Sequence, residues 1–212
     1  MNKKFLYLGI IIAVGISITI VYYNTTSITS NTSTSKYVET NLILKQKLSE
    51  RGILLSSPIR LQTSDEIKQY CSFFKDPDVQ KIVEYCTSTE LKDKDGNFLG
   101  NIHMVGSKDT PRITLVLIQT DPFMSKIDSV KKTFDTTIDE LVCNCWENTK
   151  PGNFVNVDDW VEGLRHFHTT EMKPHSKSRP IILDGRTMQM EITTNKEGYL
   201  WQLYINNTKS SP

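Results

Sequence analysis

The sequence predicts an α+β fold: one transmembrane helix followed by a single domain, with a mainly antiparallel sheet of about five strands and helices on one face. Three observations predict it. Several segments with strand patterns are joined by short turn signals, which favours antiparallel pairing. Other segments carry apolar residues at helical spacing. The chain of 212 residues also begins with a long apolar run, which leaves room for one ordinary domain.

The N-terminal anchor is the run at residues 5–23, which contains no charge and no proline. A helix of that length spans about 28 Å, close to the ~30 Å of a hydrocarbon core. Lys3 and Lys4 precede the run, and the next positive charge is Lys36. The positive-inside rule therefore makes residues 1–4 a cytoplasmic tail and places the rest of the chain outside.

A cleaved signal peptide is the alternative interpretation of the same run. Its apolar region is usually shorter and ends in small residues at a cleavage site, whereas this run ends in Val-Tyr-Tyr. We therefore expect a single-pass protein of the cell membrane that contacts the bilayer through residues 5–23.

Residues 24–36 are almost wholly Ser, Thr and Asn, a composition typical of a flexible, solvated stalk. Within it, Asn31 begins an Asn-x-Ser/Thr sequon, and its exposed position makes it the favoured site for a glycan. The stalk leads into an extracytoplasmic α+β domain at residues 37–208, and residues 209–212 are expected to be a disordered tail.

The domain opens with helical patterns. Residues 37–51 predict a helix that Gly52 ends, and residues 59–63 predict a short strand. A helix at residues 65–75 follows Ser64-Asp65. Asp76-Pro77 is a typical restart signal, so a second helix is predicted at residues 77–86, giving a helical hairpin.

The middle of the domain combines strands and a long helix. The turn signal Lys94-Asp95-Gly96-Asn97 precedes a strand at residues 98–105. Residues 112–120 are apolar on both faces, which predicts a central, covered strand. Apolar residues at helical spacing then predict a helix at residues 125–146.

The C-terminal part predicts one more helix and a three-stranded meander. The helix spans residues 157–170, and the strands span residues 180–183, 186–194 and 199–205, joined by turns. The buried helix face is predicted to consist of Trp160, Val161, Leu164 and Phe167. The inward strand residues are predicted to be Met188, Met190, Ile192, Tyr199, Trp201, Leu203 and Ile205.

Four cysteines in an exported domain favour disulfides over free thiols. Pairing Cys71 with Cys86 leaves Cys143 with Cys145, a ring with one intervening residue that is expected to be strained. The two crossed pairings avoid that strain, and the sequence favours them slightly. A redox pair is the functional alternative for Cys-x-Cys, but the strand-linked Cys-x-x-Cys typical of thioredoxin-like sites is absent.

The histidines suggest a metal site. His166, His168 and His175 form the only histidine cluster, and imidazole groups suit copper or zinc, with Cys143 and Cys145 as further candidate ligands. Helical positions two apart diverge by about 200°, so the first two histidines converge only if the segment is extended. Isolated exposed histidines are the alternative, and no other cofactor is predicted.

The composition argues against nucleic-acid binding, because 25 basic residues face 24 acidic ones and the net charge is +1. No nucleotide-binding loop, nucleophile elbow or zinc-protease motif is present. We therefore expect a non-enzymatic, membrane-anchored binding or accessory module with a protein or small-ligand partner outside the cell. A copper- or zinc-binding protein is the alternative, and a hydrolase or redox enzyme is the third possibility.

Overall fold

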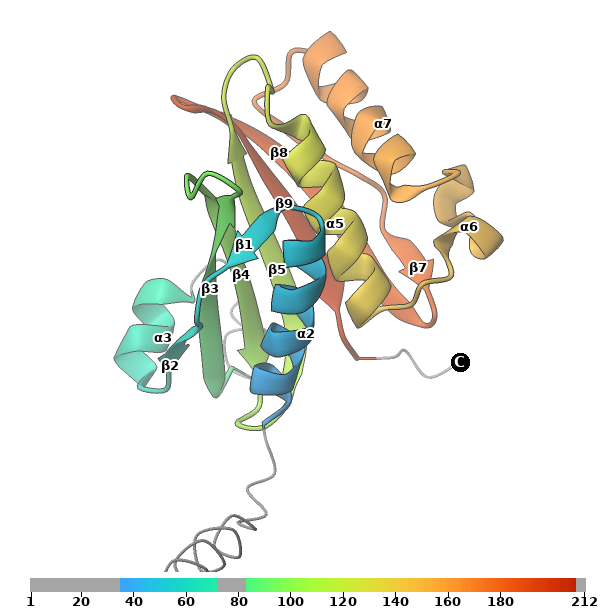
Figure 1. Ribbon diagram of the computed structural model, residues 1–212. Helices are drawn as coiled ribbons and strands as arrows, with labels where there is room; N and C mark the ends of the chain where they lie inside the picture. Colours follow the sequence, from blue (N-terminus) through green and yellow to red (C-terminus); the bar gives the residue numbers. More distant parts are fainter. Residues whose placement is uncertain (1–34, 72–82, 209–212) are drawn as a thin grey trace, which may run out of the picture. The chain divides into compact units, whose positions relative to one another are not determined.

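The computed structural model describes residues 35–71 and 83–208 (Figure 1). The predicted anchor, almost all of the stalk with Asn31, and the C-terminal tail lie outside these ranges. Within them, no helix combines the length and the apolar character that a membrane crossing requires.

The described part of the chain forms an α+β fold with one nine-stranded antiparallel sheet, so the class is confirmed and the sheet is larger than the predicted five strands. The strands are β1 (Ile53–Leu55), β2 (Ile59–Leu61), β3 (Tyr85–Asp93), β4 (Phe98–Gly106), β5 (Pro111–Thr120), β6 (His175–Lys177), β7 (Ile181–Leu183), β8 (Arg186–Asn195) and β9 (Gly198–Asn206). Their order is β1-β3-β4-β5-β9-β8-β6, with β2 also paired to β3 and β7 to β8.

Three long helices cover one face of the sheet (Figure 1). The helices are α2 (Lys36–Glu50), α3 (Ser64–Tyr70), α5 (Ile127–Leu141), α6 (Trp146–Thr149) and α7 (Val157–Thr170), with a 3-10 turn, η1, at Pro151–Asn153. The main core lies between the sheet and α2, α5 and α7. A smaller core on the opposite face joins Ile67 of α3 to strand residues that include Cys86 and Leu115.

Strand β5 shows why both faces are covered. Val116 and Ile118 are fully buried in the main core, and Leu115, the neighbour of Val116, is fully buried in the smaller core. Side chains alternate between the two faces of a strand, so an uninterrupted apolar run is the pattern of a strand buried on both sides. The predicted central, covered strand is confirmed.

Two helix predictions are corrected. Tyr85 and Cys86 begin β3, so the helix predicted at residues 77–86 does not extend to Cys86; residues 77–82 lie outside the described ranges. Thr87 and Thr89 alternate with less buried residues in β3, which is a strand pattern.

The helix predicted at residues 125–146 ends at Leu141. A disulfide between residues two apart cannot form in a helix, and the Cys143–Cys145 bridge accordingly follows the last turn.

Candidate functional site

The cysteines pair as Cys71–Cys86 and Cys143–Cys145, with Cα–Cα distances of 6.7 and 5.2 Å. The crossed pairing favoured from the sequence is therefore wrong. The physical reason is the sheet: Cys71 and Cys86 lie in the smaller core on one face, whereas Cys143 and Cys145 pack against the main core on the other. A backbone layer separates the two pairs, so the shorter local bridges form instead.

The three candidate metal ligands lie in different surroundings. His166 is exposed on α7, His168 is buried on the same helix, and His175 is exposed on β6. His175 bonds Thr193 through Nδ1 at 3.0 Å, and its Nε2 lies 3.6 Å from Glu191. Across residues 35–71 and 83–208, no three His, Cys, Asp or Glu side chains form a group suited to a metal ion. Copper or zinc binding stays a prediction from the sequence.

His168 corrects the predicted buried face of α7. The apolar stripe continues from Leu164 to His168 at a spacing of four residues, and Phe167 is 43% exposed instead of buried. Both ring nitrogens of His168 lie 2.9 Å from hydroxyl groups, Nδ1 from Ser176 and Nε2 from Thr194. Two hydroxyls can satisfy an imidazole in a buried position, which is how a histidine replaces an apolar residue in this stripe.

His168 also lines a pocket of about 430 Å³, and its ring packs edge-on against the Tyr199 ring, with centroids 5.5 Å apart. Burial lowers the pKa of His168, and the nearby His175 adds to this effect. The ring is therefore neutral near pH 7. A neutral imidazole between two hydroxyls can hold or pass a proton, but its partner at Nδ1 is a hydroxyl, which stabilises an imidazolium less than a carboxylate does.

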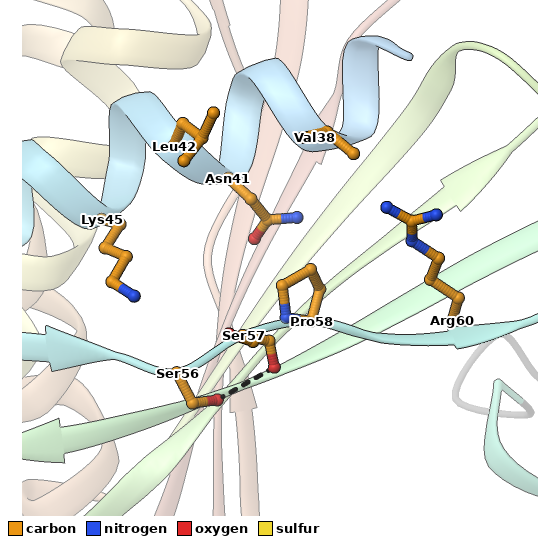
Figure 2. Close-up of a pocket in the computed structure, with 8 residues that line it drawn as sticks. All are labelled: Val38, Asn41, Leu42, Lys45, Ser56, Ser57, Pro58 and Arg60. Carbon is orange, nitrogen blue, oxygen red and sulfur yellow. Dashed lines mark hydrogen bonds between the residues drawn. The ribbon is translucent and has the colours of Figure 1, made fainter. Parts of the chain in front are cut away.

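A second concavity, which we call the α2 groove, lies between helix α2 and the connection from β1 to β2 (Figure 2). It has a volume of about 290 Å³. Its lining residues are Val38, Asn41, Leu42 and Lys45 from α2, and Ser56, Ser57, Pro58 and Arg60 from the β1–β2 segment. The helix residues follow the i, i+3, i+4, i+7 spacing of one helix face.

Local sequence explains how the groove forms. Strands β1 and β2 both pair with β3 at the end of the sheet, in register at Leu55↔Leu91 and Ile59↔Ser88. Pro58 lies between them and has no N–H to contribute to a strand ladder, so the edge strand is interrupted there. The interruption leaves space beneath α2.

Hydrogen bonds fix both walls of the α2 groove. Asn41 is buried, donates from Nδ2 to the Tyr37 carbonyl at 3.0 Å, and accepts at Oδ1 from the Thr89 hydroxyl at 3.1 Å. Ser56 accepts the Glu90 N–H at its Oγ at 3.0 Å, and its own N–H donates to the Glu90 carbonyl at 3.0 Å. Helix and edge segment are thus both fastened to β3, and the groove between them is preformed.

The α2 groove carries positive charge without a counter-charge. Lys45 projects from α2 at one end, and Arg60 projects from β2 toward α2 at the other (Figure 2). In the part of the chain that the structure describes, neither forms an ion pair. Leu42 lies between the two ends and is 61% exposed. The groove can therefore bind a negatively charged group and an apolar group together.

Sequence reasoning missed the α2 groove because its two cations are separated along the chain by a helix end and a strand. No spacing motif links Lys45 to Arg60. The one local signal was Ser56-Ser57-Pro58, which interrupts an otherwise strand-like segment.

The fold and the groove define an antiparallel α+β domain with a preformed, positively charged cleft at one end of its sheet. No protein-family model matches the chain, and neither a curated protein nor a solved structure matches it. The α2 groove is therefore the basis for the proposed function.

Proposed function

We propose that the chain is a membrane-anchored, extracytoplasmic binding or accessory module without enzymatic activity, and that it binds its partner in the α2 groove. The observation that carries the proposal is a pair of cations, Lys45 and Arg60, that form no ion pair within residues 35–71 and 83–208 and lie on either side of the exposed Leu42. Exposed charge and apolar surface on a rigid frame are the properties of a recognition site.

The chemistry of the lining supports binding over catalysis. The groove offers an ammonium, a guanidinium, hydroxyls and apolar surface, and it holds no histidine or carboxylate that would act as a general base. The apolar run at residues 5–23 and the Ser/Thr/Asn stalk support a location outside the cytoplasm, at the membrane surface.

Site-specific photo-crosslinking in intact cells tests the proposal. A benzophenone side chain replaces Leu42 in the groove, and a matched variant carries it at Ile182 on β7, which has a similar exposure of 64%. We expect a discrete adduct from position 42 and none of that size from position 182. The same cells carry a tag after Pro212, which external protease should remove. Equal labelling at both positions, or a tag shielded from protease, contradicts the proposed function.

A further inference from the structure

We infer that the α2 groove binds an extended peptide segment that carries two acidic side chains with an apolar side chain between them. The inference rests on the proposed function and names the class of partner for the same site.

The positive charge of the α2 groove indicates an acidic ligand. Lys45 and Arg60 have no acidic partner in the described part of the chain, and none of the groove's lining residues is a carboxylate. Glu90 on β3, whose N–H donates to Ser56 of the groove, pairs through its carboxylate with Lys92 at 3.0 Å. The ligand must therefore supply the negative charge. The planar guanidinium of Arg60 matches a carboxylate with two parallel hydrogen bonds.

The separation of the two cations indicates an extended ligand. They lie at opposite ends of the groove (Figure 2), and Val38 and Lys45 on the lining face of α2 are seven residue steps, or about 10 Å, apart along the helix. A single small anion cannot contact both ends. An extended peptide advances about 3.3 Å per residue and its side chains alternate between two faces, so acidic side chains four residues apart cover this length from one face.

Apolar side chains lie between the two cations of the groove. Leu42 and Pro58 present apolar surface between the two cations, and the exposed Ser57 has a backbone N–H that donates no hydrogen bond within the described residues. An extended segment offers a carbonyl for that N–H and an apolar side chain for Leu42. An acid, an apolar residue and a second acid at alternate positions (i, i+2, i+4) share one face of an extended segment and fit the lining.

Fluorescence anisotropy of defined peptides tests the inference. The full-length protein is placed in phosphatidylcholine nanodiscs and titrated against three fluorescein-labelled octapeptides with Glu-Ser-Leu-Ser-Glu, Gln-Ser-Leu-Ser-Gln or Lys-Ser-Leu-Ser-Lys at their centre. We expect the Glu peptide to bind at least ~10-fold more tightly than the Gln peptide, and the difference to shrink as salt rises. The Lys peptide should show the weakest binding.

A matched pair of double variants locates the site. Lys45→Gln/Arg60→Gln should lose ~10-fold or more of its affinity for the Glu peptide. Arg179→Gln/Lys196→Gln removes the same charges from exposed positions outside the groove and should bind as the unchanged protein does. Circular dichroism melts confirm that both variants are folded.

Three outcomes overturn the inference: equal binding of the Glu and Gln peptides, equal losses in the two double variants, or displacement of the Glu peptide by inorganic phosphate or by vesicles containing phosphatidylserine at the same charge concentration. These outcomes are independent of the crosslinking experiment. An adduct at position 42 without preference for the Glu peptide refutes the ligand class and leaves the binding function in place. A shielded C-terminal tag refutes the proposed location and leaves peptide binding unaffected.

Discussion

His103 and Asp139 give the domain opposite pH dependences of stability, and a single substitution should separate them. His103 on β4 is 6% exposed, and burial lowers its pKa from 6.5 to about 4. The unfolded chain therefore takes up a proton at a higher pH than the folded chain does. The stability contributed by the neutral ring is complete above pH ~6.5 and is lost as pH falls toward 4, with an upper limit of about 3 kcal/mol.

Asp139 on α5 acts in the other direction. Burial and the neighbouring Asp135 raise its pKa from 3.8 to about 6, and Arg51, 3.9 Å away, opposes the shift. The folded state favours the protonated acid, so the stability from this group is present below pH ~3.8 and is lost as pH rises through 6. The shift corresponds to about 3 kcal/mol at most. Because the side chain is 22% exposed, solvent screening reduces the expected effect to about 1–2 kcal/mol.

The substitution Asp139→Asn removes the loss of stability with rising pH that Asp139 causes. It leaves the loss of stability with falling pH that His103 causes. The variant should be more stable than the unchanged domain by about 1–2 kcal/mol at pH 7 and equally stable near pH 4, because Asn resembles the protonated acid. Arg51 keeps its contact with Asp135 in the variant.

Urea unfolding followed by tryptophan fluorescence at pH 4, 5.5 and 7 measures the difference. The experiment uses a chain that starts at Ser35, since residues from there onward form one compact unit. The gain in the free energy of unfolding of the variant over the unchanged domain should appear as the pH rises from 4 to 6. A gain that is the same at all three pH values, or a loss at pH 7, refutes the assignment of Asp139 as a buried, disfavoured charge.

Three further predictions concern stability and are measured by the same unfolding assay. Phe134→Ala removes a fully buried ring of α5 and should cost about 3–5 kcal/mol, whereas Phe123→Ala, at a ring 93% exposed, should change stability by less than about 0.5 kcal/mol; similar losses would contradict the core assignment. His168→Leu leaves two hydroxyls without their partner and should cost about 1–3 kcal/mol despite its apolar side chain; an unchanged or raised stability would show that the hydroxyl bonds contribute nothing. Opening the Cys71–Cys86 bridge by a double serine substitution frees a loop with a sequence separation of 15 and should cost about 2–4 kcal/mol; a midpoint unaffected by reductant in the unchanged protein would argue against the bridge.

The sequence predicted elements whose signals are local. The helix predicted at residues 157–170 coincides with α7, and the Asp184-Gly185 turn separates β7 from β8 as expected. Met188, Met190 and Ile192 are all fully buried, because strict alternation identifies the inward face of a strand when one face packs on a core. These elements have caps, turns or periodic patterns of their own.

Other features depend on contacts between distant segments, which a local pattern does not contain. The burial of His168 requires Ser176 on β6 and Thr194 on β8 to satisfy its ring. The strand character of β3 depends on pairing with β1, β2 and β4, because the strand propensity of a short segment is set largely by packing against its neighbours. The α2 groove also depends on contacts between distant segments, since its two walls meet only after α2 has packed on the sheet.

Pro58 has a consequence that extends beyond one molecule. The terminal strand of an open sheet can pair with the same strand of another copy, and repeated pairing leads to fibrils. Between β1 and β2 the missing N–H of Pro58 prevents a long continuous ladder from forming. This edge of the sheet is therefore open to short partners, and it disfavours pairing with neighbouring copies of the chain.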